Sequence, residues 1–203
     1  FPTRRSSDLL DAGVSLTTRK TLSAFTSLGY SVEGVSCSEM KDTAWQNTII
    51  GGSSIDQNGR LLYPDGQPRY RILFVNGGYS TGHGKTLRES CLQYMRDFVH
   101  KGGSYVGTCA GATFASAGNS TTPDNPYYLH IWPGVAMQTG LLNQSLNFAI
   151  DKDSPLLRCN YFPDNYLLNV NHNKGNYAGE IIDGTIVLSR YNCPNFPAVH
   201  NKP

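Results

Sequence analysis

Five residues near the middle of the chain, Gly107-Thr108-Cys109-Ala110-Gly111, follow the pattern glycine, any residue, nucleophile, any residue, glycine. The pattern is typical of a sharp turn from a strand into a helix, which holds the nucleophile exposed in a strained backbone conformation. Backbone N–H groups at the start of a helix favour a thiolate and can stabilise an oxyanion. We therefore predict acyl transfer through a thioester, with Cys109 as the nucleophile. A structural cysteine in a glycine-rich turn is the alternative.

A second glycine-rich turn, Asn76-Gly77-Gly78, follows the apolar run that ends at Val75. Without side chains, the backbone of Gly77 and Gly78 can approach a substrate carbonyl and donate N–H groups to it. We expect these two glycines and Ala110 to line an oxyanion site. A simple turn at the end of a strand is the alternative.

Five histidines are available as a general base, and we assign none of them to catalysis. His172 follows a predicted strand and is the weak candidate, although its neighbours, residues 171–175, favour an exposed turn. His83 stands between Gly82 and Gly84, close in sequence to the Gly77-Gly78 turn, and is expected to be a solvated loop residue.

The elements that position these residues alternate between strand and helix. Residues 71–75 form a continuous apolar run, as in a strand buried on both faces. Residues 87–99 carry apolar side chains at helical spacing, and a short strand is predicted at 104–107. This succession indicates an α/β fold with a right-handed crossover and a parallel sheet, whose ligand site lies beyond the carboxyl ends of the strands. Gly77 and Cys109 both lie there.

The flanking segments carry weaker patterns. Before the apolar run, we predict a helix over 16–28, a strand over 30–35, a short helix over 38–46 and a long loop or hairpin over 50–70. After Gly118, we predict antiparallel strands at 128–132, 135–139 and 146–150, a further strand at 166–171 and a last strand at 184–189.

Composition excludes several classes of function. The chain has 203 residues, of which 39% are hydrophobic and 16% charged, as expected of one globular domain. The net charge of +2 comes from interspersed residues without a basic stripe, so nucleic acid is not an expected partner. No apolar run is long enough to span a membrane. No glycine pattern of the dinucleotide-binding type occurs, and we expect no cofactor.

The five cysteines lack the close pairing of a structural zinc site, so no metal is expected. Besides Cys109, the other four permit two disulfides in an oxidising compartment or buried thiols in a reducing one. Two glycosylation-type triplets, at Asn119 and Asn143, suit a secreted protein but also occur by chance. The sequence leaves a cytoplasmic or secreted location, and the oligomeric state, open.

The first nine residues, Phe1 to Leu9, look like the translation of a short-read sequencing adapter, and we exclude them from fold reasoning as a non-native tail. The expected organisation is one domain over residues 10–203, incomplete at both ends.

Two stretches, residues 72–78 and 96–112, resemble the amino-terminal domain of biotin-protein ligases, a branch of the class I glutamine amidotransferase-like superfamily. Residues 129–136 resemble the apolar Pro-Gly segment of that family, and residues 11–15 resemble the turn after its first strand. The resemblance implies a flavodoxin-like or Rossmann-like three-layer fold. Its central sheet would be mostly parallel, with an antiparallel excursion after the helix that follows the nucleophile.

The resemblance also implies a reaction. In this superfamily an elbow cysteine attacks an amide carbonyl, while a histidine with an acidic partner serves as acid and base. Cys109 matches the cysteine, and the ligand would be a small molecule with an amide or carboxyl group. The family's histidine segment is expected beyond Pro203, so this chain would lack it. A non-catalytic ligand-binding or regulatory module with the same fold is the alternative. The branch that places a histidine directly after the cysteine is disfavoured, because Ala110 stands there.

Overall fold

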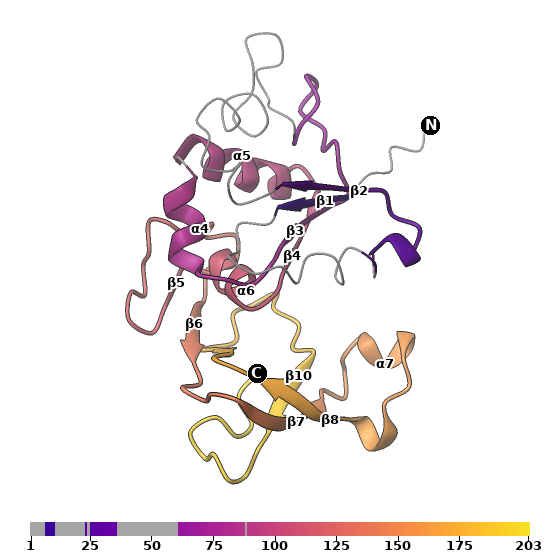
Figure 1. Ribbon diagram of the computed structural model, residues 1–203, viewed down its shortest axis with the longest axis vertical. Helices are drawn as coiled ribbons and strands as arrows, with labels where there is room; N and C mark the ends of the chain where they lie inside the picture. The colour runs from indigo at the N-terminus through magenta and orange to yellow at the C-terminus, as the bar shows by residue number, and fades with distance from the viewer. Residues whose placement is uncertain (1–6, 11–22, 24, 36–60, 88) are drawn as a thin grey trace. The chain divides into compact units, whose positions relative to one another are not determined.

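The computed structural model describes residues 7–10, 23, 25–35, 61–87 and 89–203, and within them the fold is mixed α/β (Figure 1). The chain divides into two compact units, which are described separately. The first comprises residues 1–117 and 125–132, and the second comprises residues 118–124 and 133–203. The single domain over 10–203 stays a prediction.

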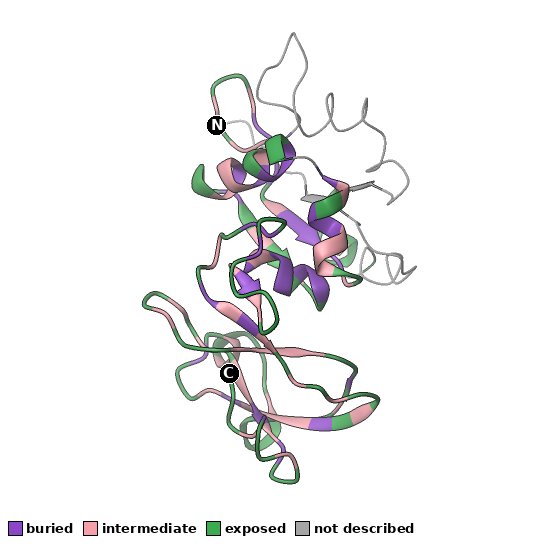
Figure 2. Cartoon of the chain, turned by 90° about the vertical axis from the view of Figure 1, so that its left-hand side faces the viewer, coloured by how far each residue is buried: buried purple, intermediate pink, exposed green. Residues whose placement is uncertain are grey.

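The first unit contains a parallel sheet in the order β2-β1-β3-β4. Its strands are β1 (Ser7–Leu10), β2 (Val32–Val35), β3 (Ile72–Val75) and β4 (Ser104–Gly107). Three of them confirm the strands predicted at 30–35, 71–75 and 104–107. An apolar run suits β3 because it is buried along most of its length, as Figure 2 shows.

Residues 1–9 were excluded from the fold, and strand β1 corrects this prediction because it includes residues 7–9. It pairs with β2 on one side and β3 on the other, with Leu9 in register with Gly34 and Phe74. The exclusion rested on likeness to an adapter, which carries no information about conformation. The origin of these residues stays a prediction, but residues 7–10 are part of the sheet.

Within the described residues 61–87 and 89–132, three helices accompany this sheet. They are α4 (Ser80–Thr86), α5 (Glu89–His100) and α6 (Ala110–Ala115). The helix predicted over 87–99 is confirmed by α5, and α4 was not predicted. Of the helix predicted over 16–28, residues 23 and 25–27 are described and helical. The helix predicted over 38–46 lies outside the described residues. Residues 50–60 of the predicted loop also lie outside the described residues. The rest of that loop contains an antiparallel bridge between Leu62 and Pro68.

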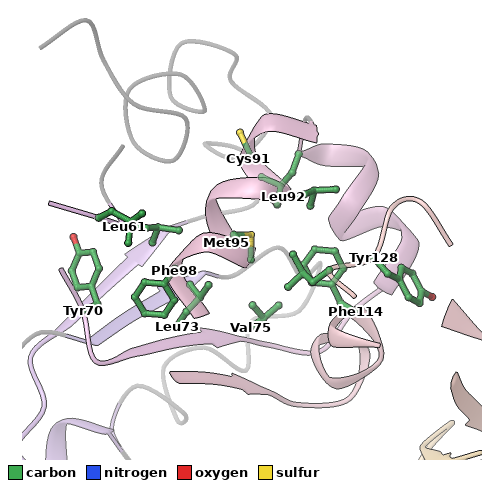
Figure 3. Packing of buried hydrophobic residues seen from close by; sticks show 13 residues of the cluster. Leu61, Tyr70, Leu73, Val75, Cys91, Leu92, Met95, Phe98, Phe114 and Tyr128 are labelled. Carbon is green, nitrogen blue, oxygen red and sulfur yellow. The ribbon is translucent and has the colours of Figure 1, made fainter. Parts of the chain in front are cut away.

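The core of the first unit forms where α5 meets the sheet. The buried residues of α5 recur at helical spacing along one face of the helix. Strand β3 contributes Leu73 and Val75 to the same core (Figure 3). Phe114 brings α6 into the same cluster. The buried members are Leu61, Leu62, Tyr70, Leu73, Val75, Leu87, Cys91, Leu92, Met95, Phe98, Phe114, Tyr128 and Leu129. The helix that follows Cys109 is therefore held by core packing.

The strand predicted at 128–132 is wrong. The N–H groups of Leu129, His130 and Trp132 donate to carbonyls at the end of α6 and just beyond it. The side chain of Arg96 donates to the carbonyl oxygens of Tyr128 and Leu129 at 3.2 and 3.0 Å. These bonds satisfy the polar groups of the segment without a strand partner and use carbonyls that a helix end leaves unpaired.

The second unit contains two three-stranded sheets. One has the order β10-β7-β8 and is antiparallel, and the other has the order β5-β6-β9, with β5 parallel and β9 antiparallel to β6. The strands are β5 (Gly118–Asn119), β6 (Val135–Gln138), β7 (Gln144–Ile150), β8 (Tyr166–His172), β9 (Asn176–Ala178) and β10 (Ser189–Asn192). The short helices α7 (Leu156–Cys159) and η2 (Pro163–Asn165) lie between β7 and β8.

The antiparallel pairs after α6 confirm the strands predicted at 135–139, 146–150 and 166–171. The last strand was predicted at 184–189 but covers Ser189–Asn192, where Tyr191 and Cys193 join the small core of this unit. Because these sheets are mixed and partly antiparallel, the three-layer, mostly parallel arrangement is not confirmed. Among the described residues, no helix has the length and apolar character needed to cross a membrane.

Candidate functional site

The site forms where two parallel strands end side by side. Val75, the last residue of β3, is in register with Gly107, the last residue of β4. The Thr108 N–H donates to the Val75 carbonyl at 3.0 Å, which extends the pairing by one bond. The turn after β3 and the turn after β4 therefore leave the same edge of the sheet, as the sequence predicts for Gly77 and Cys109.

Cys109 adopts the strained conformation that the sequence pattern predicts. Its φ is 53° and its ψ is −116°, in a region that residues with a Cβ rarely occupy. It is the N-cap residue of α6, and its carbonyl accepts from the Thr113 N–H at 3.2 Å. The Cys109 side chain is exposed. The backbone is bent at a cost of about 1–3 kcal/mol, and the bend leaves the thiol open to solvent.

The two flanking glycines are needed because backbone segments approach each other closely. A Cβ placed on Gly107 would lie 2.6 Å from the carbonyl carbon of Gly111. A Cβ placed on Gly111 would overlap the carbonyl oxygen of Val75 in β3. The hydroxyl of Tyr105 donates to the Gly111 carbonyl at 2.7 Å, and burial raises the pKa of Tyr105 well above its usual value. The hydroxyl therefore stays protonated as a donor.

Gly77 and Gly78 make different contributions to the site. A Cβ placed on Gly77 would lie 3.2 Å from the Cys109 Cβ and 3.5 Å from its Sγ, so Gly77 lies directly against Cys109. The Gly77 N–H donates to Asn76 Oδ1 at 2.8 Å. Gly78 has a φ of 147°, which favours glycine. Gly78 therefore follows a residue whose N–H is already hydrogen-bonded to Asn76.

Ala110 is the first residue of α6 and is buried. The N–H groups in the first turn of a helix have no acceptor within that helix. The Ala110 N–H therefore belongs to the part of the helix that attracts anions, directly after the Cys109 thiol. This is the position that the sequence predicts for an oxyanion donor.

Asn76 joins the two turns, and the sequence analysis did not single out its side chain. It is 6% exposed, and its Oδ1 accepts from the Gly77 N–H and from the Thr108 hydroxyl at 3.2 Å. The signal available in the sequence was a polar residue placed directly after a buried apolar strand.

His172, the weak candidate base, lies in the second unit at the end of β8 and is buried, which corrects the expected exposed turn. Its Nε2 lies 2.8 Å from the Thr139 hydroxyl and 3.2 Å from the Gly175 N–H, which donates to it. Burial lowers the pKa of His172, so the neutral ring is favoured. The Nε2 atom of His172 is therefore engaged with one side-chain hydroxyl and one backbone N–H of its own unit.

His83 was expected to be a solvated loop residue, and that prediction is wrong. It is 1% exposed within α4, and its ring stands edge-on to Phe114 of α6, with centroids 5.7 Å apart. A Cβ on the neighbouring Gly84 would overlap the backbone of Tyr127, so close packing selects glycine here.

Three of the other four cysteines are described, and all three are free thiols. Cys91 and Cys193 are buried thiols, and Cys159 is an exposed thiol in α7. Cys37 lies outside the described residues. The structure therefore contradicts a pair of disulfides built from these four cysteines. Within the described part of the chain, no group of three or more His, Cys, Asp or Glu side chains is placed to hold a metal ion.

Comparisons with known proteins support the resemblance seen in the sequence. Residues 64–126 match the family model described as biotin-protein ligase, N terminal. A segment of 46 residues, 23% of this chain, is 39% identical to the biotin–protein ligase of Schizosaccharomyces pombe (strain 972 / ATCC 24843). That segment spans only 7% of the yeast protein.

The fold is also similar to that of a solved structure, the crystal structure of a glutamine amidotransferase. The TM-score is 0.58 at 18% identity, over 91% of this chain and 80% of the other. This likeness concerns the fold alone. The predicted resemblance to the biotin-protein ligase N-terminal family, within an amidotransferase-like fold, is therefore confirmed.

Proposed function

We propose that this chain is a glutamine amidotransferase-like domain in which Cys109 attacks an amide carbonyl of a small molecule. The observation that carries the proposal is the strained backbone conformation of Cys109, with a φ of 53° and a ψ of −116°, at a cysteine that is exposed. Strain at a non-glycine residue persists only where the surrounding structure enforces it, and such residues cluster at active sites. The ligand class, an amide or carboxyl compound, follows from the family resemblance.

The reaction begins with attack by the Cys109 thiolate on the carbonyl carbon. A C–S bond forms, and the carbonyl π pair moves to oxygen as an oxyanion. When the oxyanion collapses, the C–N bond breaks and the amine leaves with a proton, giving a thioester. Water then adds to the thioester and releases the carboxylic acid and the Cys109 thiol. Proton transfer requires a base and an acid, and we assign neither.

We propose the N–H groups of Gly78 and Ala110 as the oxyanion donors. Ala110 has the helix-start position, and Gly78 follows Gly77, whose N–H is used by Asn76. Gly77 lines the site through its close approach to Cys109. Two donors fixed before the reaction stabilise the developing charge without reorganisation.

The finer description of the fold belongs to the same proposal. We take the parallel sheet of the first unit to be the central layer of a flavodoxin-like, three-layer fold. The order of its strands, with β1 between β2 and β3, supports this arrangement. A ligand at the carboxyl ends of such strands would meet Cys109.

A second candidate is a non-catalytic ligand-binding or regulatory module that keeps the elbow as a pocket. It is favoured by the contacts of His172, the weak candidate base, whose Nε2 atom is already engaged with Thr139 and Gly175 in its own unit. Under this hypothesis Cys109 would lie against a bound ligand without forming a thioester.

The test uses a chloroketone built on the glutamine side chain, which occupies an amide site and alkylates a nearby thiolate. We expect labelling of Cys109 that saturates with reagent concentration and is slowed by added glutamine. Cys159, also exposed, is the matched control and should label slowly without saturation. Equal, unsaturated labelling at both cysteines would contradict a substrate site. Glutamine that raises the melting temperature of the chain and of Cys109→Ala, without labelling, would favour the binding module.

A further inference from the structure

We propose that Asn76 is a positioning residue that fixes which backbone N–H faces the oxyanion. The inference rests on the proposed function and deepens it. Its basis is the side-chain oxygen of Asn76, which accepts from the Gly77 N–H at 2.8 Å and from the Thr108 hydroxyl at 3.2 Å. One atom thus joins the turn after β3 to the turn that carries the nucleophile.

The first of these bonds selects the donor. The Gly77 N–H points to Asn76, so it is not available to a substrate oxygen. The next N–H along the chain is that of Gly78, a residue with a φ of 147°. Two consecutive glycines have wide conformational freedom, and a bond to the first restricts the orientation of the peptide that follows. Asn76 therefore presets the Gly78 N–H.

The second bond ties this donor to the nucleophile. Thr108 immediately precedes Cys109, and its own N–H pairs with the Val75 carbonyl. Holding the Thr108 hydroxyl and the Gly77 amide on the same oxygen fixes the distance between the two turns. A carboxamide oxygen has two lone pairs and can accept both bonds at once.

Burial makes the arrangement costly to lose. Asn76 is 6% exposed and its bond to the Gly77 N–H is partly buried, so a side chain without this oxygen would leave that N–H without its acceptor at a partly buried position. The Gly77 peptide would then turn toward another acceptor, and the Gly78 peptide would turn with it. We expect the Cys109 thiol to keep its conformation, because the close approaches of Gly107 to Gly111 and of Gly111 to Val75 do not involve the Asn76 side chain.

This difference separates two reactions of the same thiol. With p-nitrophenyl acetate, the Cys109 sulfur forms a bond to the acyl carbon through an oxyanion, and p-nitrophenolate leaves with its electron pair. With iodoacetamide, the sulfur displaces iodide in one step and no oxyanion forms. Misplacing the oxyanion donor slows the first reaction and spares the second.

The experiment measures both rates at Cys109 by mass spectrometry of the peptide that contains it. For Asn76→Ala we expect acylation to fall by about 10- to 100-fold, in line with the loss of one oxyanion donor. Alkylation should change by less than about 3-fold, since no oxyanion is involved. Thr108→Val, which removes one of the two bonds, should lower acylation less, and Thr108→Ser, which keeps the hydroxyl, should restore it.

Two results would overturn the inference. Acylation and alkylation that fall together in Asn76→Ala would mean that the residue only maintains the elbow, and unchanged acylation would mean that it positions nothing. Acylation of Cys109 in the unchanged chain that is no faster than acylation of Cys159, which is also exposed, would overturn the proposed function and this inference with it.

Discussion

The elbow around Cys109 and the turn around His172 are built from similar parts. In each, a glycine lies directly beneath a side chain that can do chemistry. A Cβ on Gly77 would press against Cys109, and a Cβ on Gly175 would overlap the His172 ring. In each, a residue other than glycine has a positive φ, 53° at Cys109 and 57° at Lys174.

The two turns use these parts differently. In the elbow the strained residue is the proposed nucleophile itself, and it is exposed. In the other turn the reactive group is buried, and its ring nitrogen contacts the Thr139 hydroxyl and the Gly175 N–H. In one turn the side chain helps to hold the backbone, whereas in the other the backbone holds the side chain out to solvent.

The largest effect is expected from Gly111→Ala. The new Cβ would overlap the Val75 carbonyl, which is fixed in β3 and cannot yield, so we expect a loss of about 3 kcal/mol or more in the free energy of unfolding. At Gly175 the overlapping group is a histidine ring, which can rotate away, so Gly175→Ala should cost about 1–2 kcal/mol, mainly through lost hydrogen bonds. Urea unfolding measures both losses.

Gly140→Ala is the control for this pair. Gly140 has a φ of 73° and open space around it, so only its backbone conformation opposes a side chain, at about 1 kcal/mol. A loss at Gly111 no larger than that at Gly140 would contradict the close approach of the elbow to β3.

A smaller effect tests the strain at Cys109. Because its φ and ψ suit glycine, Cys109→Gly should be more stable than Cys109→Ala by about 1–2 kcal/mol. Cys159 is helical, so Cys159→Gly should be less stable than Cys159→Ala, by about 1 kcal/mol or less. The predicted difference in the free energy of unfolding between the glycine and alanine variants thus has opposite signs at the two positions, and thermal or urea unfolding measures it. Glycine that is worse than alanine at both positions would show that the elbow stores no strain.

The smallest effect concerns pH and His172. Burial lowers the pKa of His172 in the folded chain, so below the ordinary value of 6.5 the unfolded chain binds more protons. The stability contributed by the neutral ring is therefore fully present above pH 6.5, and it is lost progressively as the pH falls from 6.5 through the lowered pKa of the folded chain. We expect the urea midpoint to decrease between pH 7.5 and 5.5, and to decrease less in His172→Gln. The same pH dependence in both would contradict a buried, neutral His172.

The variant His172→Gln also tests whether His172 contributes to the reaction of Cys109. Because its ring nitrogen is engaged with Thr139 and Gly175, we expect the rate of Cys109 alkylation at pH 7 to be unchanged. A large decrease in that rate, without loss of fold, would restore His172 as a base.

The sequence predicted the elbow because its determinants are local. An apolar run marks β3, helical spacing marks α5, and the two glycines around Cys109 mark the turn. Their physical reason, the approach of Gly111 to Val75, joins residues far apart in the chain, but the glycine itself is visible in the sequence.

The parts that failed depend on distant partners. His172 is buried through Thr139, 33 residues away, and no spacing in the sequence indicates that pair. The segment around His83 has two glycines and a low helix propensity, yet α4 forms because Gly84 packs against Tyr127. The segment 128–132 has an apolar pattern but binds the end of α6, and Asn76 shows its role only when β3 and β4 lie side by side.

The most direct test of the central claim compares two exposed thiols, Cys109 and Cys159, in one experiment. The chain is treated with iodoacetamide at pH 7 under conditions of low conversion, and the alkylation rate of each cysteine is measured by mass spectrometry. If the elbow activates its thiol, Cys109 reacts at least about tenfold faster than Cys159, while the buried Cys91 and Cys193 react more slowly still. Equal rates at Cys109 and Cys159 would contradict an activated nucleophile.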